Sequence, residues 1–132
     1  MEFRAPPEWA AMPGDDTPPA DRDPAWWSRC AFVDVDMATT EASLVSALLR
    51  RGLPHARVVK LERVQNRMLR MRYDQARHLV NLRAGEVNEQ WLFHGTYTST
   101  PADLCEDPEG LDPRRSSGGF YGCGTYLAES AA

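Results

Sequence analysis

Two short stretches in the second half of the sequence contain residues able to hold a small polar ligand. The first is LFHGT, residues 92–96, in which a histidine ends an apolar run and a glycine follows it. The imidazole of His94 can hydrogen-bond a sugar hydroxyl, and Gly95 lets a flat ligand approach the backbone N–H and C=O groups closely. By itself a histidine beside a strand is more often a structural hydrogen-bonding residue, so this pair needs support from elsewhere in the chain.

The second stretch is YGCGTYLA, residues 121–128. Its two glycines allow a tight turn, and the extended run that follows begins with Tyr126. An aromatic ring there can pack on a planar heterocycle, and its hydroxyl can hydrogen-bond a ligand. The alternative is a glycine-rich hairpin with tyrosines in the core. The Gly-x-Gly pattern is not a dinucleotide-binding fingerprint, because it has no third glycine at the required spacing and no strand that leads directly into a helix.

The elements that position these residues can be predicted from periodicity and from residues that start or end helices. Residues 30–35 form a candidate strand, and Thr39-Thr40 are candidate N-caps of a helix that Gly52 and Pro54 end. Residues 57–64 are rich in β-branched side chains and alternate apolar with charged residues, which is typical of a strand.

This second strand is expected to lead directly into a long helix over residues 65–83, which Gly85 ends. Gln65 and Asn66 would be caps at the junction. One helix face would carry Leu69, Tyr73, Ala76 and Val80. Arginines at 67, 70, 72, 77 and 83 would lie around the rest of it. A solvated helix face explains such arginines better than a nucleic-acid contact does.

The remaining elements are short. Residues 91–94 are expected to be a buried strand, and Thr100-Pro101-Ala102-Asp103 is a typical helix start with a hydroxyl cap and a carboxylate three residues later. Residues 107–119 are expected to be a loop, and residues 126–128 a further strand. Together these elements predict a mixed α/β (α+β) fold with an incomplete sheet and packed helices.

Composition limits the classes of protein to consider. The 132 residues fit one domain, and residues 1–24, rich in proline and aspartate, are expected to be a disordered tail before a domain over residues 25–132. The net charge of -4 disfavours binding to nucleic acid. Three widely spaced cysteines argue against a disulfide framework and a zinc site, so no metal is expected. Without an apolar run of membrane-spanning length or a signal-peptide pattern, we expect an intracellular protein, cytoplasmic or nuclear, with no membrane contact.

Four stretches, in this order, resemble the catalytic domain of the poly(ADP-ribose) polymerase family of ADP-ribosyltransferases. They are LERVQNRMLRMRY (61–73), NEQWLFHGT (88–96), GLDPR (110–114) and YGCGTYLA (121–128). The family pattern is I-x-RVQN-x-x-L with a later Tyr, then NE-x-x-LFHGT, GFD-x-R and YG-x-G-x-YFA. The resemblance begins near Trp26 and extends to the end of the chain, and it favours the mono-ADP-ribosylating branch.

The resemblance implies a site for NAD and gives the matching residues their roles. His94 would hydrogen-bond ribose hydroxyls of NAD, Gly95 would hold the nicotinamide carboxamide through its backbone, and Thr96 would support that turn. Tyr126 would pack on the nicotinamide ring as the second member of the family's His-Tyr-Glu set, so His94 and Tyr126 are the candidate catalytic residues. Tyr121 and Ala128 of the same motif are also assigned to the NAD site.

The implied reaction transfers ADP-ribose from NAD to a protein acceptor and releases nicotinamide. Leu111 and Leu127 replace the family's usual phenylalanines and Arg70 a common tryptophan, which leaves the site assignment intact. Family members also have a serine, a second tyrosine and a third catalytic position that would lie beyond Ala132. The alternative is an inactive interaction module that keeps the fold without the chemistry.

Overall fold

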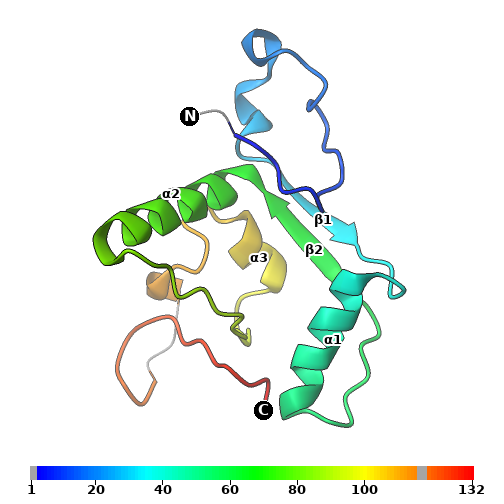
Figure 1. Ribbon diagram of the computed structural model, residues 1–132, viewed down its shortest axis with the longest axis vertical. Coiled ribbons are helices and arrows are strands. Elements are labelled where there is room, and N and C mark those ends of the chain that lie inside the picture. Colours follow the sequence, from blue (N-terminus) through cyan, green and yellow to red (C-terminus); the bar gives the residue numbers. More distant parts are fainter. Residues whose placement is uncertain (1–2, 116–118) are drawn as a thin grey trace.

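A computed structural model describes residues 3–115 and 119–132. At its centre lies a two-stranded antiparallel sheet of β1 (Cys30–Asp34) and β2 (Glu62–Asn66), in which Cys30 pairs with Asn66 and Asp34 with Glu62. Helix α1 (Thr40–Gly52) lies near one end of the sheet, α2 (Arg67–Ala84) continues from the other end, and α3 (Pro101–Glu106) packs beside β2 (Figure 1). The mixed α+β fold with an incomplete sheet is thus confirmed.

The second strand begins later than predicted. It covers Glu62–Asn66 instead of residues 57–64, because the register with β1 ends at the pair Asp34–Glu62. Beyond that pair the N–H of Val35 donates a hydrogen bond to the carbonyl of Leu61, at 2.9 Å. Alternation therefore predicted the strand, but the length of its partner sets where the strand starts.

Helix α1 begins and ends where the sequence predicts. The Thr39 hydroxyl accepts a hydrogen bond from the N–H of Ala42, and the helix ends at Gly52. In its first turn, Glu41 forms an ion pair with Arg63 of β2, which ties the helix to the sheet. A Cβ on Gly52 would lie 2.7 Å from the backbone nitrogen of Ala132, so the last residues of the chain pass directly over this helix end.

Helix α2 is likewise capped as predicted at both ends. The side-chain oxygen of Asn66 accepts from the N–H of Leu69 at 3.1 Å, and Gly85 ends the helix with φ of 77°, the left-handed conformation that glycine favours. The predicted apolar face is uncovered over most of its length, because Tyr73 and Val80 are 46% and 47% exposed. Packing within the chain thus involves the first turn of α2 more than the rest.

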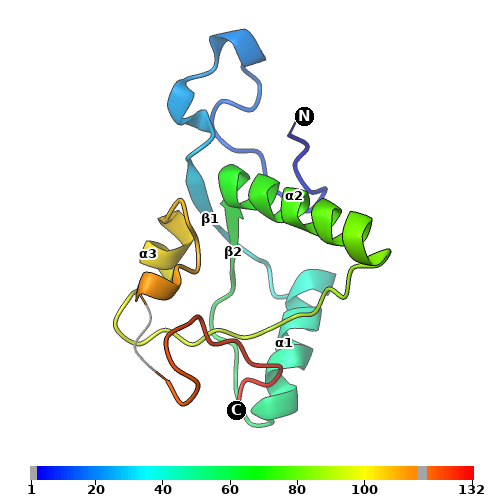
Figure 2. The same cartoon turned by 90° about the vertical axis from the view of Figure 1, so that its left-hand side faces the viewer.

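The amino-terminal segment, residues 3–29, packs against the β2–α2 junction. It contains two short 3-10 turns, Pro19–Asp21 and Pro24–Trp26, and its blue ribbon passes close to the start of α2 (Figures 1 and 2). Gln65, which the sequence suggests as a cap, is fully buried and exchanges two 2.9 Å hydrogen bonds with the backbone of Ala10.

Arg67 is the other buried residue at this junction. It is 1% exposed, pairs with Asp15, donates to the carbonyl of Trp26 at 2.9 Å, and stacks on the Trp26 ring 4.0 Å from its centroid. The disorder predicted for residues 1–24 rests on composition, which carries no information about such contacts; residues 1–2 lie outside the described part of the chain.

The two strands predicted near the candidate site are shorter than expected. Residues 91–94 and 126–128 meet in a single antiparallel bridge, Phe93 with Ala128, and neither forms a longer strand. A strand needs a partner along its length, and these segments have one pair of partners between them. Helix α3 starts as predicted, with a reciprocal capping box between Thr100 and Asp103. The predicted loop over 107–119 contains a 3-10 turn at Pro113–Arg115, and its residues 116–118 lie outside the described chain.

Candidate functional site

A cavity of about 520 Å³ lies where the LFHGT and YGCGTYLA stretches meet. Its wall includes five of the six residues assigned to the site, namely His94, Gly95, Thr96, Tyr126 and Ala128. They come from two segments far apart in the sequence, and the Phe93–Ala128 bridge joins these segments through backbone hydrogen bonds of 2.7 and 2.9 Å. A volume of this size accommodates a small organic ligand.

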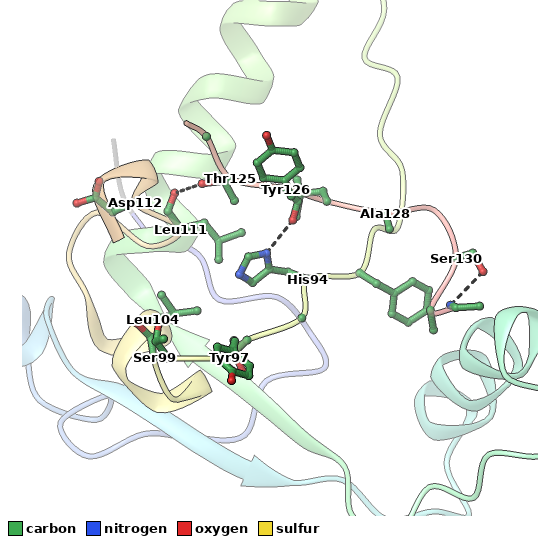
Figure 3. Close-up of a pocket in the computed structure, with 18 residues that line it drawn as sticks. His94, Tyr97, Ser99, Leu104, Leu111, Asp112, Thr125, Tyr126, Ala128 and Ser130 are labelled. Atoms are coloured by element: carbon green, nitrogen blue, oxygen red, sulfur yellow. Dashed lines mark hydrogen bonds between the residues drawn. The ribbon is translucent and has the colours of Figure 1, made fainter. Parts of the chain in front are cut away.

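The imidazole of His94 has one nitrogen engaged and one open. Its Nδ1 lies 2.8 Å from the carbonyl oxygen of Tyr126, and because a carbonyl can accept but not donate, Nδ1 carries the proton. In the neutral ring Nε2 is then an acceptor. Among the described residues no side chain or backbone group hydrogen-bonds Nε2, which points toward the space between Leu111 and Tyr97 in Figure 3. His94 is thus prepared to accept a bond from a ligand hydroxyl.

The hydroxyl of Tyr126 is occupied by the chain itself. It donates to the carbonyl of Gly122 at 2.7 Å and accepts from the N–H of Tyr121 at 3.1 Å. A Cβ on Gly119 would lie 2.5 Å from the Tyr126 ring, so glycine is required there for the ring to occupy this place. The sequence predicts that Tyr126 contacts a ligand through both its ring and its hydroxyl. In the structure Tyr126 is 40% exposed, so its ring can contact a ligand, whereas its hydroxyl is hydrogen-bonded within the turn.

Tyr121 lies apart from the cavity wall. Its side chain is 94% exposed, and its contact with the site runs through its backbone N–H to Tyr126. Its assignment to the NAD site therefore stays a prediction, with a backbone rather than a side-chain contact as its nearest link to the cavity.

The described part of the chain leaves room for a side chain at Gly95. A Cβ added there would have no heavy atom within 4 Å, and Gly95 is not among the described glycines with positive φ. Neither packing nor backbone strain therefore explains a glycine at this position. Open space beside the backbone is what a flat ligand would need in order to pair with Gly95 N–H and C=O. Thr96 follows on the same cavity wall.

The opposite wall is built from residues that the sequence analysis did not assign to the site. Leu104 of α3 and Leu111 point toward His94 (Figure 3), and Asp112 continues the wall with a side chain that is 9% exposed. The hydroxyl of Thr125 donates to the carbonyl of Leu111 at 3.1 Å, which ties this wall to the Tyr126 segment. Asp112 forms an ion pair with Arg114 at 2.6 Å. The GLDPR stretch was a signal for this wall, because it carries both Leu111 and Asp112.

The thiols of Cys30 and Cys105 are poorly suited to act as nucleophiles. Burial raises the pKa of the Cys30 thiol to about 11, and burial also raises that of Cys105, so both thiols stay protonated at neutral pH. Within the described ranges no three His, Cys, Asp or Glu side chains gather as metal ligands would. A search of the same residues for a helix long and apolar enough to cross a membrane finds none.

Comparisons with known proteins identify the family to which the chain is similar. The family model of the poly(ADP-ribose) polymerase catalytic domain matches residues 39–132. A probable poly [ADP-ribose] polymerase of Dictyostelium discoideum is 30% identical over 106 residues, which are 76% of this chain and 32% of that protein. Protein mono-ADP-ribosyltransferase PARP12 of Mus musculus is 30% identical over 118 residues, 83% of this chain and 17% of the relative. Human PARP14, also a protein mono-ADP-ribosyltransferase, is 27% identical over 82% of this chain and 6% of its own length.

The chain thus spans a third or less of each of these relatives. The family match nevertheless includes all of the cavity wall and the four motif stretches. Because that match covers more than half of the chain, it shows that this chain belongs to the poly(ADP-ribose) polymerase catalytic domain family.

Proposed function

We propose that this chain forms the NAD-binding part of an ADP-ribosyltransferase that transfers ADP-ribose to a protein acceptor, one unit at a time. Membership of the family supports the reaction class. Two relatives named as protein mono-ADP-ribosyltransferases support the mono-transfer. NAD and a protein acceptor are the partners proposed.

The observation that carries the proposal is the 2.8 Å bond between His94 Nδ1 and the Tyr126 carbonyl. It brings the two candidate catalytic residues together from positions 32 apart in sequence and fixes which imidazole nitrogen is an acceptor. A ribose hydroxyl supplies the donor that Nε2 lacks, and the open backbone at Gly95 suits a carboxamide. The apolar wall of Leu104 and Leu111 suits one face of a nicotinamide ring.

NAD supplies the reacting bond, which joins nicotinamide to ribose and breaks through an oxocarbenium-like transition state. The contribution of this chain is orientation: His94 holds the sugar, and Gly95 and the Tyr126 ring hold the nicotinamide. Holding a reactant in one geometry can supply several kcal/mol of the barrier reduction. The Tyr126 carbonyl keeps the imidazole in the required tautomer.

His94→Ala tests the proposal directly. NAD binding by the parent chain should be measured by calorimetry, and transfer by labelling of proteins with a tagged NAD. We expect the variant to lose most NAD affinity, because the hydroxyl of the ribose then lacks its acceptor, while its melting temperature changes little. His55→Ala is the matched control, since His55 lies in the turn after α1 and away from the cavity wall.

The outcomes separate the candidate functions. Loss of NAD binding in His94→Ala and retention in His55→Ala supports the proposal. Equal binding by His94→Ala and the parent would refute the site assignment. Absence of NAD binding in a folded parent chain would instead favour the alternative of an interaction module, for which the exposed apolar side chains of α2 are the specific observation.

A further inference from the structure

Side chains of α2 contact the two chain segments that lead to the cavity walls. Tyr73 and Arg77, one helical turn apart, both donate to the carboxylate of Glu89, one to each oxygen. One residue before Tyr73, Arg72 donates to the carbonyl of Pro108 and pairs with Glu109 at 3.4 Å. Glu89 precedes the His94 wall and Glu109 precedes the Leu111 wall, so Arg72 and Arg77 have partners within the chain while they stay about half exposed, as expected for a solvated helix face.

The segment that carries His94 has few other attachments. It leaves α2 at Gly85 and contains no helix or strand among the described residues up to the Phe93 bridge. Of its apolar side chains, Val87 is half-buried and borders a cavity beside α2, whereas Trp91 is 69% and Leu92 is 42% exposed. Among the described residues, the hydrogen bonds and the ion pair between residues 86–92 and α2 are those of Glu89. The place of His94 relative to α2 therefore depends on the contacts of the Glu89 carboxylate and on the Phe93–Ala128 bridge.

We propose that Glu89, clasped by Tyr73 and Arg77, is a positioning residue for His94. This inference rests on the proposed function, since it concerns the same site. The clasp uses both carboxylate oxygens and two donors fixed on one helix, which defines the carboxylate's orientation as well as its place. His94 lies five residues further along, so a displaced Glu89 would let the imidazole move away from the Tyr126 carbonyl.

Energetics favour a role in placement over one in folding. The side chains of Arg77 and Glu89 are 54% and 41% exposed, and an ion pair in solvent adds little to global stability. Misplacement of a binding group by about 1 Å can nevertheless cost as much as 100-fold in rate. Loss of the hydrogen bonds from Tyr73 and Arg77 to Glu89 should therefore change the position of the His94 ring more than it changes the melting temperature.

The test compares Glu89→Gln with Glu86→Gln. Both changes remove one carboxylate from the same segment, and among the described residues Glu86 forms no hydrogen bond or ion pair. The first readout is the nitrogen NMR spectrum of the His94 ring, assigned by its absence in His94→Ala. The parent should show the Nδ1-protonated form, and Glu89→Gln should show averaging toward the other tautomer. The second readout is NAD affinity, with a loss of roughly 10-fold expected for Glu89→Gln and none for Glu86→Gln.

Tyr73→Phe provides a second, conservative variant should Glu89→Gln fail to fold. It removes one of the two donors and should give a smaller change in the same direction. Unaltered His94 signals in a folded Glu89→Gln or Tyr73→Phe chain would overturn the proposal, as would equal effects of Glu86→Gln. A parent chain that binds no NAD, yet whose His94 signals respond to Glu89→Gln, would leave the positioning intact and overturn the proposed function.

Discussion

His94 and Tyr126 contribute different kinds of atoms to the same cavity. The side chain of His94 faces the cavity through Nε2, whereas Tyr126 contributes its carbonyl to the imidazole and its hydroxyl to the turn at Gly122. The motif stretches that resemble the family indicated both positions. They could not predict that the backbone of one residue would set the tautomer of the other, because that depends on how two distant segments pair.

Gly95→Ala should separate ligand binding from stability. Because an added Cβ meets no atom within 4 Å and Gly95 is outside the positive-φ set, the free energy of unfolding should stay equal or rise by up to about 1 kcal/mol. Nicotinamide binding should weaken, because the methyl group occupies space that the ligand needs. Urea denaturation and calorimetry with nicotinamide measure the two effects.

Gly14→Ala is the contrasting control for that experiment. Gly14 has φ of 87° and a Cβ there would lie 3.0 Å from the Trp26 ring, far from the cavity in sequence. We expect this variant to lose stability and to keep its nicotinamide affinity. Stability loss with full nicotinamide affinity in Gly95→Ala would show that the glycine is structural.

At the scale of elements, sequence predicted helices better than strands. The N-caps at Thr39 and Thr100, the cap at Asn66 and the stop at Gly85 depend on neighbouring residues, and all four occur. Strand limits depend on a partner elsewhere in the chain, so β2 begins later than predicted and residues 91–94 form one bridge. The α3 side of the cavity was missed for the same reason: Leu104 reaches the site through tertiary packing.

The amino-terminal segment should make stability depend on acid through Asp15. Burial alone would raise the pKa of this carboxyl. The hydrogen bonds from the N–H of Met12 and from Arg67, together with the charge of Arg67, lower the pKa by more than burial raises it, so the net shift is downward. A lowered pKa means that the stabilisation is complete above the unfolded value of about 3.9 and is lost as pH falls through the lower folded value.

Asp15→Asn tests that dependence. We expect a loss of about 1 to 3 kcal/mol at pH 7, below the usual cost of breaking a buried pair, because Asp15 is one-third exposed while Arg67 is buried. The acid part of the stability profile should flatten in the variant. Asp16→Asn is the control, since Asp16 is adjacent to Asp15 and forms no ion pair within the part of the chain that the structure describes. A profile equal to that of the parent would show that residues 3–29 do not stay on the junction.

Across the whole molecule, apolar surface is unevenly covered. Among the described residues the buried apolar side chains are few (Met12, Trp26, Val35, Ala42 and Leu104), whereas large apolar residues are exposed along α2, beside the cavity and on the turn near Tyr121. The two-stranded sheet and the Phe93–Ala128 bridge also leave backbone groups at their edges. Sequence patterns identify the family but do not show which apolar surfaces are buried, because an apolar helix face has the same residue pattern whether or not a partner packs on it.

This distribution predicts that the chain, studied by itself, binds apolar dyes and associates as its concentration rises. The exposed apolar side chains include Tyr73, Val80, Trp91 and Leu127, and a net charge of -4 opposes association only weakly at physiological salt. Sedimentation velocity over a range of concentrations, with dye fluorescence in parallel, measures both properties. Val80→Glu together with Leu82→Lys should reduce both the association and the dye binding, since each replaces an exposed apolar side chain of α2 with a charged one. A monomer at all concentrations without dye binding would mean that these side chains are covered in solution by a rearrangement of the chain.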